Sequence, residues 1–238
     1  VEPASKKPRT ENIPAPSPLP AASPATGNNK VFGGDSADAA KDLYDNWAKK
    51  YDADLESWGW TSPRRVAEFL GELGCGPLQH VLDAGCGTGL SGAALKVAGI
   101  GSEGGIVGID ISQASLDIAN AKGVYATTVC GNLEEPFALD AATFDAVVCS
   151  GVSSYIRHFD KFLFEVCRVL RSGGVFVMTH RYDFWDTDEH KCRSTITAMA
   201  DKNAWSIERI GEPEFHMPNN PDPVHSSKRI RLLAFRKS

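Results

Sequence analysis

An acidic residue followed by three glycines is the stretch of this sequence with the clearest potential for chemistry. Asp83 stands at the end of a short apolar segment, and Gly85, Gly87 and Gly89 follow it on alternate positions. Glycines let a chain turn sharply and let a ligand approach the backbone. A carboxylate that faces such a turn favours a ligand with positive charge over a bare phosphate. We therefore expect this loop to bind a small molecule that carries a cationic group.

The loop is expected to join a buried strand to a helix. Residues 80–84 are mostly apolar and branched, which is typical of a strand covered on both faces of a parallel sheet. Residues 90–99 have the composition of a helix. A strand, a glycine turn and a helix in this order place a ligand at the carboxyl edge of an open α/β sheet.

One alternative for the loop is a dinucleotide site. Gly87, Gly89 and Gly92 satisfy the pattern G-x-G-x-x-G, in which a pyrophosphate lies on the helix N-terminus. In that pattern the first glycine closes the strand, and here that glycine is Gly85. Counted from Gly85, the third glycine position falls on Leu90, so the fingerprint fails. An ordinary strand-to-helix turn with additional glycines is the other alternative.

A second carboxylate has a matching position. Asp110 closes the next predicted strand, residues 104–110, and lies 21 residues after Gly89. An acid at this position can accept hydrogen bonds from the hydroxyls of a ribose. It could instead cap the helix that follows, but Ser112 already supplies a capping hydroxyl. The pairing of Asp110 with the loop is more specific than either feature alone.

Two further strand ends complete the predicted edge. Residues 124–129 form a third strand that leads to Asn132 and Leu133, and residues 144–150 form a fourth that ends at Ser150 and Gly151. Alternating strands and helices, with a closing pair of strands, predict a doubly wound sheet.

The form D-x-G-x-G-x-G of residues 83–89 resembles motif I of the class I S-adenosylmethionine-dependent methyltransferases. Residues 170–174, LRSGG, resemble a later motif of the same superfamily, with Ser172 where a proline is usual. S-adenosylmethionine has a sulfonium, an ammonium and no phosphate, which agrees with the acid at position 83. The segments around Trp47 and Tyr51, together with residues 178–185, are similar to the Williams–Beuren-region methyltransferase-like proteins.

The resemblance covers residues 35–238 and implies a fold and a set of cofactor contacts. The fold is a Rossmann-like, doubly wound sheet of seven strands in the order 3-2-1-4-5-7-6, with strand 7 antiparallel and N-terminal helices that cap the site. In the family, the turn after the third strand commonly carries an acid for the adenine amino group; here Asn132 replaces it. The residues expected to bind S-adenosylmethionine are Tyr51, Asp83, Ala84, Gly85, Cys86, Gly87, Gly89, Asp110, Ile111, Asn132, Leu133, Ser150 and Gly151.

Methyl transfer from a sulfonium is an in-line displacement, so much of the catalysis can come from holding the reactants in line. An oxygen or nitrogen acceptor can also need a base. His180, which closes the fifth predicted strand, is the first candidate, and Tyr155, which follows the fourth, is the second. His180 could equally cap the sheet or bind a loop carbonyl. No spacing of acids, histidines and cysteines indicates a metal site, and none is expected.

The composition and charge of the chain limit the classes of protein to which it can belong. The chain has 238 residues and a net charge of −5; residues 1–34 carry +2, which leaves −7 for the remainder. An acidic body argues against a broad nucleic-acid surface. No apolar run reaches the length of a membrane span. Six cysteines without a C-x-x-C pair indicate reduced thiols in a cytoplasmic protein. We expect a monomer or a homodimer.

Residues 1–34 contain seven of the fourteen prolines and are expected to form a disordered tail. Residues 5–9, SKKPR, are a weak match to a nuclear-import signal, and a solvated basic tail is the simpler interpretation.

The expected function is methyl transfer from S-adenosylmethionine to a small-molecule acceptor. The alternatives are a catalytically silent methyltransferase fold that binds or activates a partner, and a protein methyltransferase. The acceptor is not specified, because the segments that would decide it, residues 152–158, 181–190 and 212–226, contain no recognisable motif.

Overall fold

Eight strands form one mixed sheet in the computed structural model, which describes residues 37–238. The strands are β1 (Val81–Ala84), β2 (Ile106–Asp110), β3 (Thr127–Cys130), β4 (Phe144–Cys149), β5 (Leu170–Arg181), β6 (Trp205–Ile210), β7 (Glu214–Phe215) and β8 (Arg229–Lys237). Their order is β3-β2-β1-β4-β5-β8-β6, and the two-residue β7 pairs with β8. The predicted tail and its basic run lie outside the described residues.

The sheet order confirms the predicted topology. The five strands β1 to β5 run parallel to one another, and β8 runs antiparallel to both β5 and β6. The antiparallel strand is the eighth along the chain only because the short β7 precedes it. The reversal of strand order between β1 and β4 produces the crevice in which open α/β sheets bind their ligands.

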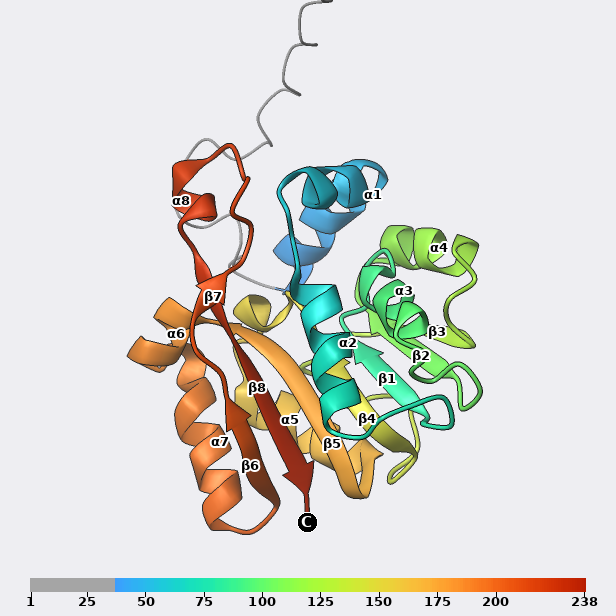
Figure 1. Ribbon diagram of the computed structural model, residues 1–238, viewed down its shortest axis with the longest axis vertical. Helices are drawn as coiled ribbons and strands as arrows, with labels where there is room; N and C mark the ends of the chain where they lie inside the picture. Colours follow the sequence, from blue (N-terminus) through green and yellow to red (C-terminus); the bar gives the residue numbers. More distant parts are fainter. Residues whose placement is uncertain (1–36) are drawn as a thin grey trace, which may run out of the picture.

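Helices cover both faces of the sheet (Figure 1). They are α1 (Ala37–Ser57), α2 (Ser62–Glu72), α3 (Leu90–Val97), α4 (Gln113–Ala121), α5 (Phe159–Val169), α6 (Tyr182–Thr187), α7 (Cys192–Asp201) and α8 (Pro223–Ser226), with 3-10 turns η1 (Ser153–Tyr155) and η2 (Glu189–Lys191). None of the helices among residues 37–238 is long and apolar enough to cross a membrane.

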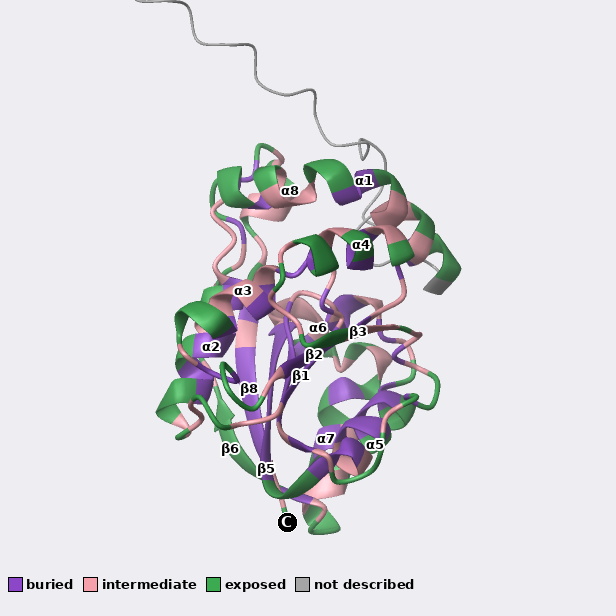
Figure 2. Cartoon of the chain, turned by 90° about the vertical axis from the view of Figure 1, so that its right-hand side faces the viewer, coloured by how far each residue is buried: buried purple, intermediate pink, exposed green. Residues whose placement is uncertain are grey.

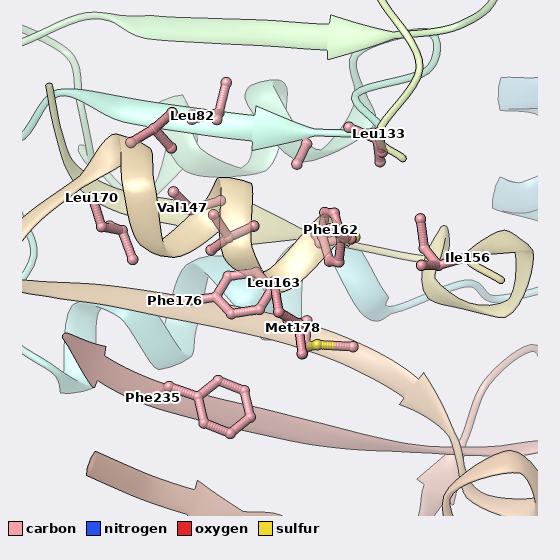
Figure 3. Close-up of a cluster of buried hydrophobic side chains, with 14 of the residues drawn as sticks. Leu82, Leu133, Val147, Ile156, Phe162, Leu163, Leu170, Phe176, Met178 and Phe235 are labelled. Atoms are coloured by element: carbon pink, nitrogen blue, oxygen red, sulfur yellow. The ribbon is translucent and has the colours of Figure 1, made fainter. Parts of the chain in front are cut away.

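The sheet is buried between two layers of helices, as Figure 2 shows. One apolar cluster joins α2 and α3 to one face of the sheet, and a larger one joins α5 and α7 to the other. In the larger cluster Phe162 and Leu163 of α5 pack over Phe176 of β5 (Figure 3). This two-sided burial explains why the central strands are almost continuously apolar.

The segment after β5 is divided into α6, the turn η2 and α7. Asp188, His190 and Lys191 have φ values of 57°, 54° and 59°, in the left-handed region that interrupts a right-handed helix. The short helix α6 carries no apolar period long enough to be recognised in the sequence.

Phe176 and Phe164 provide a matched test of this packing. Phe176 is fully buried, whereas Phe164 of α5 is 65% exposed. We expect Phe176→Ala to lower the free energy of unfolding by about 3–5 kcal/mol, because it removes a core ring and leaves a cavity. Phe164→Ala should change it by less than about 0.5 kcal/mol. Urea denaturation of the two variants measures both values, and equal losses would contradict the assigned core.

Candidate functional site

The glycine loop after β1 adopts the backbone geometry that its sequence predicts. Gly85, Gly87 and Gly89 have φ values of 81°, 50° and 94°. A Cβ atom at Gly85 would lie 2.4 Å from Cγ2 of Val152, so this glycine is needed for packing against the loop after β4. A Cβ atom at Gly87 would meet no atom within 4 Å. Gly87 therefore leaves open space above the loop.

Asp110 fixes this loop from the end of β2. One carboxylate oxygen accepts the backbone N–H of Gly87 at 2.8 Å, and the other accepts that of Ser112 at 2.9 Å. Burial raises the pKa of Asp110, and these N–H bonds oppose the rise. The hydroxyl of Ser112 accepts the N–H of Ser115 at 3.1 Å and caps α4, as expected. Asp110 consequently connects the turn after β1 to the turn after β2.

Asp83 lies beneath the loop. Its side chain is fully buried, and one oxygen accepts the hydroxyl of Tyr125 at 2.7 Å. The other oxygen has no hydrogen-bond partner among the described residues. Burial raises the pKa of Asp83 to about 7, although the hydrogen bond from Tyr125 opposes the rise. Asp83 thus lies under the loop, and it does not line the cavities described next.

Three adjoining cavities open at the carboxyl ends of the strands. The largest, called here the loop cavity, measures about 660 Å³ and lies over Gly85 and Gly87. The Asn132 cavity, of about 420 Å³, extends it toward β3 and shares Asp110 and Ile111 with it. The His216 cavity, of about 530 Å³, adjoins it on the other side and shares Tyr44, Tyr51, Trp60, Gly151 and Tyr155 with it. These sizes suit small molecules.

Most of the predicted cofactor residues line these cavities. Those in the loop cavity are Tyr51, Gly85, Cys86, Gly87, Asp110, Ile111, Ser150 and Gly151. Asn132 and Leu133 line the Asn132 cavity. Ala84 and Gly89, like Asp83, line none of the three; Ala84 is a buried strand residue and Gly89 is the N-cap of α3.

Two buried polar groups in the cavity walls make no hydrogen bond within the described chain. The hydroxyl of Ser150 lines the loop cavity, and the indole N–H of Trp60 belongs to a residue that lines both the loop cavity and the His216 cavity. A buried polar group without a partner costs about 1–3 kcal/mol. Both groups could be satisfied by a ligand that enters these cavities.

Helix α1 covers the loop cavity, and hydrogen bonds made by three of its side chains hold it there. Asp45 accepts the hydroxyl of Ser112. Asp52 accepts the hydroxyl of Thr88 and pairs with Lys122. The hydroxyl of Tyr44 donates to that of Tyr155 at 2.9 Å. Helix α1 is thus attached to the glycine loop, to the start of α4 and to η1.

The two predicted catalytic residues have different surroundings. Tyr155 lines all three cavities. His180 is 1% exposed, packs against Phe159 and Trp185, and lines none of them. Burial lowers the pKa of His180 to about 4. The structure therefore offers no contact through which His180 would reach a ligand in these cavities.

The hydrogen bonds of His180 indicate a structural role. The hydroxyl of Ser153 donates to the carbonyl of Thr179 at 2.8 Å and lies 2.8 Å from Nδ1 of His180. With its one hydrogen committed to the carbonyl, the hydroxyl accepts from Nδ1. His180 thereby fixes Ser153 at the start of η1, the turn that carries Tyr155.

Several lining residues were not identified from the sequence. Trp60, His216, His225 and Lys228 line the His216 cavity. Burial lowers the pKa of His216 to about 4, and its ring lies 3.3 Å from the hydroxyl of Ser62. The last three lining residues gave a weak sequence signal, because β7 and α8, the elements of their segment, are too short to show a period, and Trp60 lies in the short connection between α1 and α2. Among the described residues, no group of histidine, cysteine and acidic side chains is arranged to hold a metal ion.

Comparisons with known proteins agree with this geometry. Residues 82–178 match the family described as a methyltransferase domain. Human methyltransferase-like protein 27 is 35% identical over 142 residues, which cover 58% of this chain and 56% of that protein. Demethylmenaquinone methyltransferase of Symbiobacterium thermophilum is 29% identical over 147 residues, or 58% of this chain and 57% of that one. The chain thus spans somewhat more than half the length of these curated relatives.

A solved structure extends the comparison to the fold. Magnesium protoporphyrin IX methyltransferase from Synechocystis PCC 6803, with bound S-adenosylmethionine, has a TM-score of 0.60 and 19% identity; the match covers 86% of this chain and 98% of that one. At this identity the likeness shows the fold. The strand order and the glycine loop agree with the methyltransferase domain that residues 82–178 match.

Proposed function

We propose that this protein transfers the methyl group of S-adenosylmethionine to a small-molecule acceptor. The observation that carries the proposal is the contact between two cavities: the loop cavity and the His216 cavity share five wall residues. A cofactor in the first and an acceptor in the second would meet at this wall. The relative named demethylmenaquinone methyltransferase, which acts on a small molecule by its name, supports the same class of acceptor.

The residues of the loop cavity fit this cofactor. The open space at Gly87 leaves room for a ligand against the backbone, and the hydroxyl of Ser150 lacks a partner that a bound ligand can provide. We assign Asp110 to the ribose hydroxyls, since it lines the loop cavity and a carboxylate has about four lone-pair sites, more than the N–H groups of Gly87, Ser112 and Ile111 use.

Asn132 and Leu133 are assigned to the adenine. The side-chain oxygen of Asn132 accepts the N–H of Glu134 at 3.0 Å, so its amide N–H₂ is the group available to a ring nitrogen. Leu133 is buried beside it and can pack against the ring. An amide donor in place of the usual acid would therefore recognise a ring nitrogen of the base in place of its amino group.

When bound, the cofactor supplies an electrophilic methyl group on a cationic sulfur. The side chains around it can position reactants but differ in their ability to accept a proton. Burial raises the pKa of Tyr155 to about 12 and also raises the pKa values of Tyr44 and Tyr51, so all three stay protonated at neutral pH. The hydroxyl of Tyr44 already donates to Tyr155, so Tyr51 and Tyr155 are the two that can donate a hydrogen bond to the methyl acceptor. The neutral imidazoles of His216 and His225, which line the His216 cavity, are able to accept a proton from it.

Asp83 contributes to the proposed site from below. Its carboxylate lies under a loop assigned to a cationic ligand, and it holds Tyr125 against α3, where the Tyr125 hydroxyl also accepts the N–H of Gly92 at 3.2 Å. We assign Asp83 as a positioning residue.

The activity itself is tested by incubating the protein with S-adenosylmethionine and fractionated small molecules from a cell extract. We expect S-adenosylhomocysteine to form with at least one fraction and not with the extracted proteins. Calorimetry should show binding of S-adenosylmethionine and none of NADH. Binding of NADH in its place by the folded protein would refute the proposal.

Asp110→Asn tests the ribose assignment. The substitution keeps the size of the side chain but removes a charged acceptor, so we expect S-adenosylmethionine to bind about 10- to 100-fold more weakly. Asp117→Asn on the exposed side of α4 is the matched control and should bind as the parent protein does. Calorimetric titration of both variants gives the ratio; equal affinities would remove Asp110 from the site.

Asp83→Asn tests the buried carboxylate through pH. The folded pKa of about 7 lies above the ordinary 3.8, so the folded state keeps its proton while the unfolded state loses it. The proton on Asp83 makes its full contribution to the free energy of unfolding below about pH 4. This contribution falls as the pH rises to about 7 and does not change further above that pH. Relative to Asp83→Asn, the parent protein should lose up to about 1.4 kcal/mol per pH unit between pH 5 and 7.

Urea denaturation of both proteins at pH 5, 6, 7 and 8 measures this difference. Asp117→Asn serves again as the control, because its carboxylate is exposed. A difference in the free energy of unfolding between the parent protein and Asp83→Asn that stays constant from pH 5 to 8 would contradict the raised pKa of Asp83.

A further inference from the structure

The His216 cavity combines two kinds of wall. One side is aromatic, formed by Tyr44, Trp47, Tyr51, Trp60 and Tyr155. The other side carries Arg181 at the end of β5 and Lys228 just before β8. No acidic residue is among the described residues that line it. The cavity therefore presents apolar rings and positive charge to whatever occupies it.

The two cations are only partly neutralised by the protein. Asp183 accepts two bonds from Arg181, one of them from Nε at 2.9 Å, and one from Nζ of Lys228, also at 2.9 Å. Partial burial raises the pKa of Asp183, but Arg181 and Lys228 outweigh this and hold it well below the ordinary value. One ionised carboxylate thus serves two cations, and one positive charge is left over.

This surplus charge is not on an open surface. The side chains of Arg181 and Lys228 are only 15% and 25% exposed. Withdrawing a charge from water is costly unless an opposite charge approaches it. The histidines that line the cavity, His216 and His225, cannot supply a negative charge, since an imidazole is either neutral or cationic; burial lowers the pKa of each and favours the neutral form. The surplus charge is therefore suited to an anion that enters from the cavity.

The aromatic side adds a hydrogen-bond donor. The indole N–H of Trp60 is buried and has no partner among the described residues. Tyr44, Tyr51 and Tyr155 form edge-to-face contacts with one another or with Trp47, which gives a rigid apolar wall. A flat apolar molecule can pack against this wall while a negatively charged oxygen reaches the cations.

We propose that the methyl acceptor is a small molecule with an apolar, ring-containing body and an anionic oxygen group, a carboxylate or a phosphate, which Arg181 and Lys228 bind in the His216 cavity. This inference rests on the proposed function and specifies its substrate class. The anionic end lies at the β5–β8 side, away from the glycine loop. The body then extends toward Gly151 and Tyr155, the wall shared with the loop cavity, where the reacting atom has to be.

Calorimetry on the protein saturated with S-adenosylhomocysteine tests the charge requirement. The probes are naphthalene-2-carboxylate, 2-naphthyl phosphate and the neutral naphthalene-2-carboxamide, which share one ring system. We expect both anions, or one of them, to bind at least about tenfold more tightly than the amide, because a charged hydrogen bond is worth that much. The difference between the two anions then identifies which group the cations prefer.

Lys228→Met and Arg229→Met form the matched pair of variants. Lys228→Met removes one cation but leaves Arg181 paired with Asp183, whereas Arg229 is exposed and lies over the ring of Phe215, outside the cavity. We expect Lys228→Met to reduce the affinity for the anionic probe about tenfold or more without changing that for the amide. Arg229→Met should leave both affinities unchanged.

The outcomes separate this inference from the function on which it rests. If S-adenosylhomocysteine binds but the anions bind no better than the amide, the anionic acceptor is refuted and methyl transfer still stands. Equal losses of affinity for the anionic probe in Lys228→Met and Arg229→Met would also refute the anionic acceptor. If S-adenosylhomocysteine does not bind to the folded parent protein, the proposed function fails, and the inference fails with it. Retained binding of S-adenosylhomocysteine by Lys228→Met shows that the variant is folded.

Discussion

The carboxylate of Asp110 is the interaction on which the arrangement of the site depends. It accepts a backbone N–H from the glycine loop and another from the turn after β2, so one side chain sets the distance between two loops. The ladder between β1 and β2 ends at Ala84 and Ile109, and the N–H groups of Gly85 and Cys86 still donate to the carbonyl of Ile109. At Gly87 the side chain of Asp110 takes over this connection between the two loops.

Helix α1 is held in the same way, by carboxylates that accept hydrogen bonds from the two loops. Asp45 and Asp52 of α1 accept hydroxyls from Ser112 and Thr88, which stand in the two loops that Asp110 joins. Acidic side chains thus connect three segments: the loop after β1, the loop after β2 and helix α1 above them. The buried apolar cluster of this helix joins Trp47 and Leu55 of α1 to Trp58 and Met217, and it contains no strand residue.

The sequence predicted the fold and most of the residues that line the loop cavity, because both follow from strand ends. Asp110, Ser150 and Gly151 end parallel strands, and parallel strands place their carboxyl ends at one edge whatever the rest of the chain does. His180 shows where this reasoning stops. It was chosen because it closes β5, but successive residues of a strand point to opposite faces, and the side chain that reaches a cavity is that of Arg181. Choosing between adjacent residues requires the register, which the sequence pattern did not contain.

The residues of the His216 cavity could not be predicted for a related reason. His216, His225 and Lys228 come from the connection between β6 and β8, whose elements β7 and α8 are very short, and Trp60 comes from the short connection between α1 and α2. Residues without a period have no face that can be assigned in advance. They reach the cavity through the path of the connections, which is set by the tertiary packing.

The contact between Gly85 and Val152 has a practical consequence for altering the proposed cofactor site. Position 85 accepts no larger residue, since an added methyl group would collide with Val152 and the backbone there is left-handed. Val152 itself lines both the loop cavity and the Asn132 cavity but not the His216 cavity. Shortening this one side chain would enlarge the two cavities assigned to the cofactor and leave the His216 cavity unchanged, which makes residue 152 the place to engineer selectivity for a synthetic cofactor with a bulkier base.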